Sequence, residues 1–312
     1  MLSRVANNLY WMGRYLERAD HLARYSKATY FASLDAPILE NFDRDFALES
    51  MLYMAGIFDM NEIVERDVLF RIGIDSENPN SMVSNIAAAR ENARGARNVI
   101  STDLWEAINK YYFLVTNYPQ ETFLTTGLYD FTQLVADQTS IIASAMFGTM
   151  LHDGEYAIIL IGMHIERIIQ IIRIMNAKLH DIYRIEQAGI LETELSFEWA
   201  NLLKCLDSLD MSRKYYHSIP NRQEVFEFLL LNPNCPRSVS FSLRSLRRYE
   251  ENISSNELNA QNNISFSIKK LCSQYEYLTY DEFKDDVYNL LNNTLQKVTE
   301  IANNFEKKYL SF

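Results

Sequence analysis

The sequence predicts an all-α protein, a multi-helix bundle of roughly ten or more helices. The chain of 312 residues contains only 9 Gly and 6 Pro. Because these two residues interrupt regular structure most strongly, their scarcity favours long helices over many short strands. Apolar residues recur at helical spacing in most segments, whereas no segment sustains the alternating pattern of a strand. With 48% hydrophobic residues, the chain has enough apolar surface for one large core or two modest ones.

In the first half of the chain, apolar side chains at helical spacing predict each helix. The first helix follows from Leu2, Leu9, Leu16 and the apolar residues between them, and Ser81 has the hydroxyl side chain of a helix N-cap. The turn-forming segments "SLDAP", "GIDSENPNS" and "YPQET" separate the elements. The expected helices cover residues 2–30, 43–71, 82–100, 101–117 and 127–150.

In the second half, "LHDGE" forms a turn into the most apolar segment, "IILIGMHIERIIQIIRIM" at 158–175. Its length approaches that of a membrane span, but Glu166 and Arg167 would then lie near mid-bilayer, where either charge is costly. A helix buried inside a soluble bundle is therefore expected. The polar segments "NPNCP" and "SSNELNAQNN" mark later breaks. The expected helices cover residues 156–179, 198–216, 223–231, 237–253, 265–277 and 281–310.

Residues 1–312 are expected to form one intertwined domain. A boundary near Asp153 would divide it into two halves, 1–152 and 153–312, but no linker-like composition marks that point.

The overall composition argues against some classes of function and indicates a cellular compartment. A net charge of -11 argues against a broad nucleic-acid surface. The 3 cysteines are scattered and form no C-x-x-C pair, and the N-terminal segment lacks the apolar run of a secretion signal. We therefore expect a cytoplasmic protein with reduced thiols that neither binds nucleic acid nor spans a membrane.

One motif occurs twice. "GRYLER" at 13–18 and "GMHIER" at 162–167 share the pattern Gly-x-x-x-Glu-Arg, and Arg24 and Arg173 each follow the motif glutamate by seven residues. Both copies lie on expected helices. The repeat predicts two related helical units, packed about a pseudo-twofold axis.

The two glutamates of this motif are the central candidate residues. At about 100° per residue, Glu17 shares a narrow helix face with Asp20, and Ile169 takes the place of Asp20 in the second copy. The second helix is apolar nearly all round, so Glu166 should be buried. An ionised buried carboxylate needs a partner, which we expect to be an arginine of another helix because the neighbouring Arg167 points elsewhere.

Two interpretations of the motif glutamates stay open at this point. In the first, they form buried ion pairs between helices and fix the register of two halves. In the second, the two helix faces meet and line a pocket of carboxylates and guanidinium groups. Glu17 or Glu166, with a raised pKa, would then act as a catalytic general base or acid in amide-bond chemistry.

A basic cluster in "ARENARGAR" gives further candidates. Arg90, Arg94 and Arg97 are spaced i, i+4 and i+7 on one expected helix face, with Asn92 beside them. Three guanidinium groups on one face suit bidentate binding of a phosphate or carboxylate. The alternative is that these arginines are solvated or ion-paired. The two motif glutamates would also suit the arginines as partners.

The segment "NPNCPRSVSF" suggests an anion site at a helix start. Pro236 fits the first turn of a helix, which places Arg237 and Ser238 beside free backbone N–H groups. An ordinary helix start marked by proline is the alternative.

Other kinds of site lack their sequence signatures. No Glu-x-x-His pair of a carboxylate-bridged metal centre occurs; Glu17 and His21 are spaced i, i+4. No hydrolase signature surrounds a serine or cysteine, and no glycine-rich phosphate loop occurs. We therefore expect no metal or other cofactor, and no ATP binding by this chain alone.

Four segments together resemble the bacterial alpha-E family, which is named for a helical domain carrying an E-R motif. The resemblance covers most of the chain in the family's order, and it is most specific at the N-terminus. In this chain, Ile168 and Ile169 replace the Ala-Asp that usually follows the second E-R, and Cys235 stands where an aromatic residue usually precedes "PRSV". The segments are "MLSRVANNLYWMGRYLERADHLAR", "AAARENARGARNVISTDLWEAIN", "GMHIERIIQIIRIMNAK" and "FLLLNPNCPRSVSFSL".

The resemblance implies partners and a process. Family members are typically encoded beside a circularly permuted ATP-grasp protein and a transglutaminase-like protein, in what looks like a system that makes or modifies peptides or amides. The leading hypothesis is a helical accessory or co-catalytic subunit that docks on the ATP-grasp ligase and holds a charged peptide or amino-acid substrate. The alternatives are a stand-alone enzyme of amide-bond chemistry and a purely structural scaffold. The catalytic candidates are Glu17 and Glu166, and the substrate-binding candidates are Arg14, Arg18, Arg90, Asn92, Arg94, Arg97, Arg167, Arg237 and Ser238.

Overall fold

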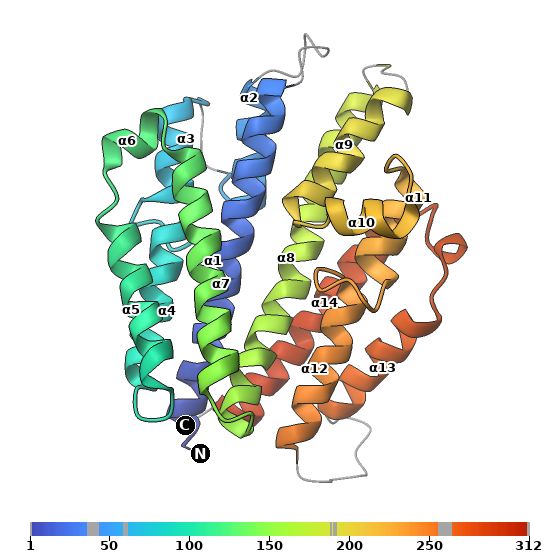
Figure 1. Ribbon diagram of the computed structural model, residues 1–312. Helices are drawn as coiled ribbons and strands as arrows, with labels where there is room; N and C mark the ends of the chain where they lie inside the picture. Colours follow the sequence, from blue (N-terminus) through green and yellow to red (C-terminus); the bar gives the residue numbers. More distant parts are fainter. Residues whose placement is uncertain are drawn as a thin grey trace.

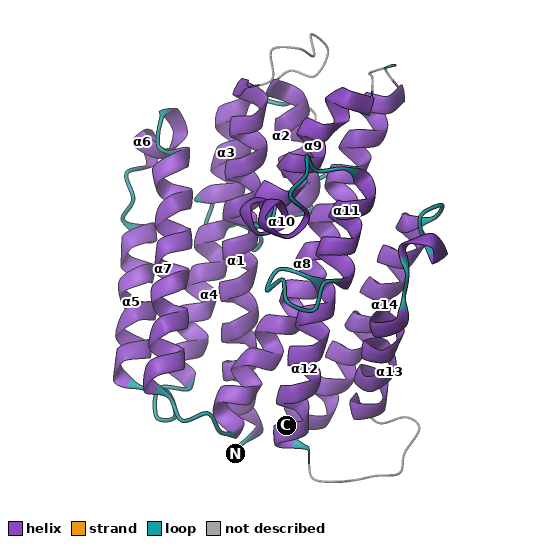
Figure 2. Ribbon diagram, turned by 45° about the vertical axis from the view of Figure 1, so that its right-hand side comes forward, coloured by secondary structure: helices purple, strands orange, loops and turns teal. Residues whose placement is uncertain are grey.

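Every regular element in the described part of the chain is a helix, which confirms the all-α prediction (Figures 1 and 2). The computed structural model describes residues 2–35, 44–58, 62–187, 189, 192–254 and 264–310. Most helices lie roughly side by side along the long axis of the bundle (Figure 1).

The first half of the chain follows the predicted order, with several differences. The first helix extends to Asp35 instead of ending near residue 30, and a short helix, α6 (Gln120–Thr125), begins within the expected break at "YPQET". The expected helix over 43–71 is two helices, because the chain turns at Gly56 with a φ of +74°. The fourth helix begins as predicted, with Ser81 accepting a hydrogen bond from the Ser84 N–H, but it ends at Gly95, a residue of low helix propensity. The helices are α1 (Ser3–Asp35), α2 (Arg44–Ala55), α3 (Glu65–Gly73), α4 (Met82–Gly95), α5 (Thr102–Thr116), α6 (Gln120–Thr125) and α7 (Leu128–Thr149).

The second half also keeps the predicted order. The expected helix over 198–216 is two helices, because the chain turns at Asp207 with a left-handed φ of 51°. The predicted break at "SLDAP" begins too early, because residues 33–35 still belong to α1, and residues 36–37 lie outside the described part of the chain. The predicted break at "SSNELNAQNN" lies outside the described part except for Ser254. The elements are α8 (Gly154–Gln187), α9 (Glu192–Cys205), α10 (Leu209–Tyr216), α11 (Arg222–Phe226), the π-helix η1 (Glu227–Leu231), α12 (Val239–Ile253), α13 (Ile264–Tyr277), the 3-10 helix η2 (Tyr280–Glu282), α14 (Val287–Phe305) and the π-helix η3 (Glu306–Leu310).

Two long helices, α1 and α8, form the centre of the bundle. They pack against each other and run in the same direction, away from the end at which the chain begins (Figure 1). α4 and α7 pack on α1, and α12 and α14 pack on α8. α5 packs on α4 and α7, and α13 packs on α12 and α14, outside the helices that touch the central pair. Together these helices bury Glu17, Asp20 and Glu166 between α1 and α8.

The glycines of the repeated motif lie where α1 and α8 cross. A Cβ atom on Gly13 would collide with the backbone oxygen of Ile159, and one on Gly162 would collide with the backbone oxygen of Tyr10. Each motif glycine thus contacts the residue that lies three positions before the motif glycine of the other helix. Such exchanged contacts are what a pseudo-twofold axis between the two helices produces. They favour the division into related halves 1–152 and 153–312, which stays a prediction.

The charged residues of α8 also bear on the membrane question. Glu166 and Arg167 lie in the middle of this helix, and both side chains point into polar contacts with α1. No helix of the described residues has the length and apolar character needed to cross a membrane.

Candidate functional site

Two reciprocal ion pairs join α1 to α8 above the glycine crossing. Glu17 accepts hydrogen bonds from the Nε and Nη2 atoms of Arg167, the second at 2.9 Å. Glu166 accepts hydrogen bonds from the Nε and Nη2 atoms of Arg18, at 2.8 and 3.1 Å. Each motif glutamate therefore pairs with the motif arginine of the other helix. This confirms the expectation that Glu166 finds its partner on another helix. We call the four residues the E-R centre.

Both carboxylates of the E-R centre are held in the ionised form. Glu17 and Glu166 are each only 1% exposed. Burial by itself raises a carboxyl pKa, but the nearby arginines outweigh it here. Arg167 holds the pKa of Glu17 well below its ordinary value, and Arg14 and Arg18 lower that of Glu166 to about 2. These shifts are opposite to the raised pKa on which the catalytic interpretation of the two glutamates depends.

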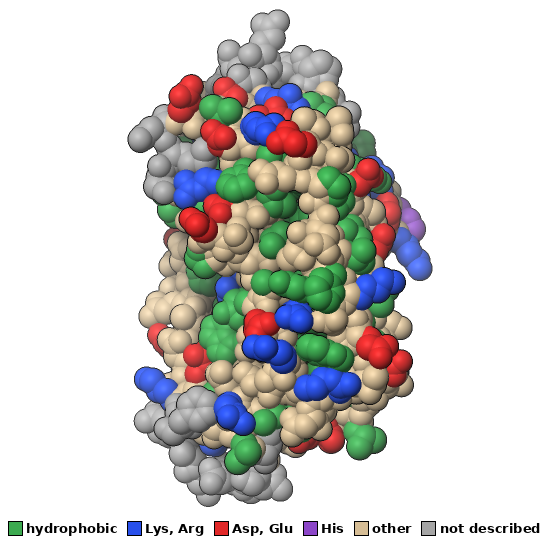
Figure 3. All heavy atoms as spheres, turned by 90° about the vertical axis from the view of Figure 1, so that its left-hand side faces the viewer, with side chains coloured by type: hydrophobic (Ala, Val, Ile, Leu, Met, Phe, Trp, Pro, Cys, Tyr) green, Lys and Arg blue, Asp and Glu red, His purple; other side chains and the backbone are tan. Residues whose placement is uncertain are grey.

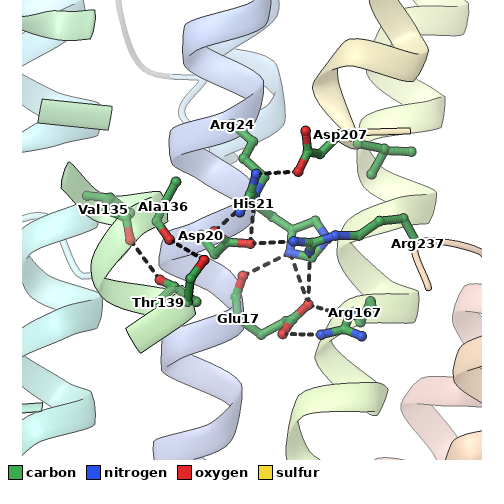
Figure 4. A network of polar contacts seen from close by, with 12 residues as sticks. Glu17, Asp20, His21, Arg24, Val135, Ala136, Thr139, Arg167, Asp207 and Arg237 are labelled. Carbon is green, nitrogen blue, oxygen red and sulfur yellow. Dashed lines mark hydrogen bonds and ion pairs between the residues drawn. The ribbon is translucent and has the colours of Figure 1, made fainter. Parts of the chain in front are cut away.

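On one side of the E-R centre, a chain of charges follows α1 towards solvent (Figure 4). Arg237, which precedes α12, donates to Asp20 Oδ2 at 3.2 Å. Asp20, only 1% exposed, also accepts from Arg24 Nε at 2.9 Å. Arg24 then donates to Asp207 Oδ2 at 2.8 Å, in the turn between α9 and α10. Three arginines, including Arg167, thus alternate with three carboxylates, so this side is electrically balanced.

His21 lies inside this network as a neutral side chain. It is fully buried, and its Nδ1 atom lies 2.9 Å from the backbone oxygen of Glu17. Burial lowers its pKa, with Arg237 adding to the effect, although Glu17 and Asp20 oppose it. Its Nε2 atom has no hydrogen-bond partner among the described residues. Because no solvent reaches the ring, His21 serves as packing within the network.

The outer end of the charge network opens into a groove between α1, α7 and the α9–α10 segment. The groove has a volume of about 830 Å³ and is lined by both charge types. The cations are Arg24, Lys27 and Lys204, and the anions are Asp137, Asp207 and Asp210. Phe31, Tyr129, Leu209 and Met211 supply apolar surface between them. We call this cavity the mixed-charge groove.

The cations of the mixed-charge groove are held in different ways. Arg24 is fixed by its contacts with Asp20 and Asp207. Lys27 donates to Gln133 at 2.7 Å and lies 4.1 Å from the centre of the Tyr129 ring. A cation is attracted to an aromatic face, so this contact helps to hold the Lys27 ammonium group in the groove.

On the other side of the E-R centre, Glu166 collects several donors. Arg14 Nε donates to it at 2.8 Å, and Gln170 donates at 2.6 Å. Arg14 also lies 3.4 Å from Glu306 of η3. Two arginines of α1 thus share one buried carboxylate of α8.

The basic cluster on α4 lies on a different face, which Figure 3 shows with basic, acidic and hydrophobic side chains intermixed. Arg90 donates to Asn109 of α5 at 2.8 Å, and Arg94 pairs with Glu91. Arg97 lies beyond the end of α4, and Asn92 donates to a backbone oxygen of its own helix. The suggestion that the motif glutamates are partners of the α4 arginines is therefore wrong, because Arg18 and Arg167 bind those glutamates within the E-R centre.

The candidates Arg237 and Ser238, just before α12, have different roles in the structure. Ser238 is the N-cap: it accepts from the Phe241 N–H at 3.0 Å and donates to the Asn232 backbone oxygen. Its hydroxyl is therefore engaged in starting the helix, as the alternative interpretation expected. Arg237 does bind an anion, but that anion is Asp20 of the same chain.

Sequence reasoning missed most of the mixed-charge groove. Lys27 follows Arg24 by one helical turn, which places both on one face of α1 and was a usable indication. Lys204, Asp207 and Asp210 belong to no motif, and only the packing of α9 and α10 against α1 brings them there. Among the described residues, no group of three or more His, Cys, Asp or Glu side chains is placed to hold a metal ion.

The fold and the site define an all-helical bundle whose two central helices are joined by a pair of exchanged Glu-Arg contacts. The chain belongs to the Alpha-E family, described as a predicted alpha-helical domain with a conserved ER motif, which matches residues 1–310. Uncharacterized proteins of Mycobacterium bovis and Mycobacterium tuberculosis are 22% identical to it over 274 residues, which is 78% of this chain. The chain spans only 29% of the length of these curated relatives. No solved structure gives a significant match.

Proposed function

We propose that this chain is a helical accessory subunit that binds a charged peptide or amino-acid substrate for an ATP-grasp-linked system that forms or modifies peptide bonds. The observation that carries the substrate proposal is the mixed-charge groove. A zwitterionic ligand needs a cation for its carboxylate, an anion for its ammonium group and apolar surface for its side chain. The groove has all three within one cavity of about 830 Å³.

In this proposal the charge network between the E-R centre and the groove holds the groove residue Arg24 in place, and Arg237 joins this network to Glu17 at 3.6 Å. Asp20 orients the Arg24 guanidinium, and Asp20 is itself held by Arg237. Rigid positioning of this kind lowers the entropy lost when a ligand binds. Arg14, Arg18 and Arg167 then contribute by fixing the two motif glutamates rather than by touching the substrate in the groove.

An accessory role fits the state of the two glutamates better than catalysis does. Glu17 and Glu166 are ionised, buried and fully paired, so neither is ready to exchange a proton with a substrate. The curated relatives also carry more than two thirds of their length outside the matched segment. The matched helical unit is therefore combined with other sequence in those proteins. The ATP-grasp and transglutaminase-like partners rest on the family resemblance.

The substrate proposal is tested by titrating the full chain with trialanine in a calorimeter. Lys27→Gln and Lys204→Gln should each weaken binding by about 10- to 100-fold, since a hydrogen bond to a charged group contributes roughly 1.5–3 kcal/mol. Lys269→Gln, which changes an exposed lysine of α13 outside the groove, is the matched control and should bind normally. Trialanine blocked as the acetyl amide should not bind. Equal binding by the blocked peptide, or by both groove variants, would refute the proposal.

The partner proposal is tested separately. The tagged chain, co-expressed with the ATP-grasp protein, should elute with it in one peak on gel filtration. Separate peaks over a wide range of concentrations would refute a stable complex while leaving the titration result untouched.

A further inference from the structure

One difference between the two sides of the E-R centre lies at the position of Asp20, where the second side has Ile169. On α1, Arg24 is neutralised by Asp20 at i−4, with a contact of 2.9 Å. On α8, the arginine at the equivalent position is Arg173, and the residue at i−4 is Ile169. Arg173 is exposed and makes no hydrogen bond or ion pair with any other residue that the structure describes. The internal carboxylate of the first side is therefore missing from the second.

The charges near Arg173 do not compensate for this loss. Arg14 and Arg18 both pair with Glu166, so this one carboxylate already serves two guanidinium groups. Although the Arg173 side chain reaches solvent, the surrounding protein partly desolvates its guanidinium group, which lowers its pKa. Glu166 opposes the shift, whereas Arg18 and Arg14 add to it. Glu306 contacts Arg14 from η3. Three arginines thus face two carboxylates, of which only Glu166 lies between α1 and α8.

Donor atoms on this side remain free for a ligand. Arg18 uses Nε and Nη2 for Glu166, which leaves its Nη1 group, and its side chain is 23% exposed. Arg173 has its whole guanidinium. Guanidinium groups recognise carboxylates and phosphates through pairs of parallel hydrogen bonds.

We propose that Arg18 and Arg173 form an oxyanion-binding site, in which a carboxylate or phosphate group of a ligand takes the role that Asp20 has on the other side of the E-R centre. The ligand would be held at the solvent edge of α1 and α8, against the apolar side chain of Ile169. This site is separate from the mixed-charge groove and does not rest on the function proposed for it.

The test compares thermal midpoints of the full chain in sodium phosphate, sodium acetate and sodium chloride at equal ionic strength. Near saturation, phosphate or acetate should raise the wild-type midpoint by about 2–4 °C relative to chloride. A rise in phosphate alone assigns the site to phosphate-bearing ligands, and a rise in acetate alone assigns it to carboxylates. Equal midpoints in all three salts would overturn the proposal.

Variants test whether the rise of the thermal midpoint in phosphate or acetate depends on Arg173. Arg173→Gln should melt at the wild-type temperature in chloride and lose the anion response, because the arginine has no described partner to lose. Ile169→Asp should lose the response for the opposite reason, since it gives Arg173 an internal carboxylate. Arg184→Gln, on the same helix but paired with Glu49, is the control and should keep the response. Retention of the full response by Arg173→Gln would also overturn the proposal.

Discussion

Glu17 and Arg167, 150 positions apart in the sequence, form a bidentate ion pair that is repeated by Glu166 and Arg18 with the two helices exchanged. Each helix therefore provides one buried anion and one cation to the other. Sliding one helix along the other by one turn, about 5.4 Å, would separate the partners of both ion pairs. The E-R centre thus specifies the register of α1 against α8.

Replacing Glu166 by glutamine should strongly destabilise the fold. The amide removes the charge that Arg14 and Arg18 share, and breaking a buried pair in this way costs about 3–5 kcal/mol. Urea unfolding at neutral pH measures the loss. Glu49→Gln, which breaks the exposed pair with Arg184, is the control and should cost about 1 kcal/mol or less. An unchanged urea midpoint for Glu166→Gln would show that the pair does not hold the fold together.

The same carboxylates predict a loss of stability in acid. The folded-state pKa values of Glu17 and Glu166 lie below the ordinary value of 4.5, so their ion pairs stabilise the protein fully above that pH. The stabilisation is lost as the pH falls through the folded-state value, which is about 2 for Glu166. The free energy of unfolding should therefore decrease between about pH 4.5 and 2, and less steeply in Glu166→Gln. Parallel pH profiles for the two proteins would contradict this assignment.

The glycine crossing should not tolerate a methyl group. Alanine at position 162 would drive its Cβ into the backbone of Tyr10, and overpacking of this kind costs about 1–3 kcal/mol or more. Gly148, near the end of α7, has no neighbouring atom within 4 Å of an added Cβ. Gly148→Ala is thus the matched control and should stabilise by about 0.5–1 kcal/mol through helix propensity. Both changes are measured by chemical unfolding, and equal effects would refute the close approach.

The three thiols should be unreactive until the protein unfolds. Cys205, Cys235 and Cys272 are buried, and burial raises their pKa values, to about 11 for Cys205 and Cys272. Because the thiolate is the reactive form, native protein at pH 8 should react slowly with a disulfide reagent such as DTNB. In guanidinium chloride, which unfolds the protein, all three thiols should react rapidly with DTNB. Rapid labelling of native protein would show that a thiol is accessible.

The class of fold and the E-R centre were largely predictable, because both depend on local pattern. Helical spacing and scarce glycine are properties of short segments, and the duplicated "GRYLER" and "GMHIER" identified the two central helices. The need of a buried Glu166 for an arginine partner followed from solvation energy alone. Which arginine it was did not follow, since that depends on how α1 and α8 cross.

Elements that depend on tertiary contacts were less accessible. The breaks at Gly56 and Asp207 occur at single residues with positive φ, inside segments whose apolar spacing continues. Lys204 and Asp210 reach the mixed-charge groove only because α9 and α10 pack beside α1. The α4 cluster looked like a partner for the glutamates because charge alone was considered, without the distance between the two faces.

The exchanged Glu-Arg contacts are those of a symmetric dimer, but both sides belong to one polypeptide. In a true dimer of identical chains, every substitution appears on both sides at once. Here the two sides can differ, and they do: the position equivalent to His21 holds Gln170, and the position equivalent to Arg14 holds Met163. One chain can thus combine a charge-balanced side, around Asp20, with a side that carries excess positive charge, around Arg173. Because both sides belong to one chain, each can carry its own set of charges, which the symmetry of a dimer of identical chains would forbid.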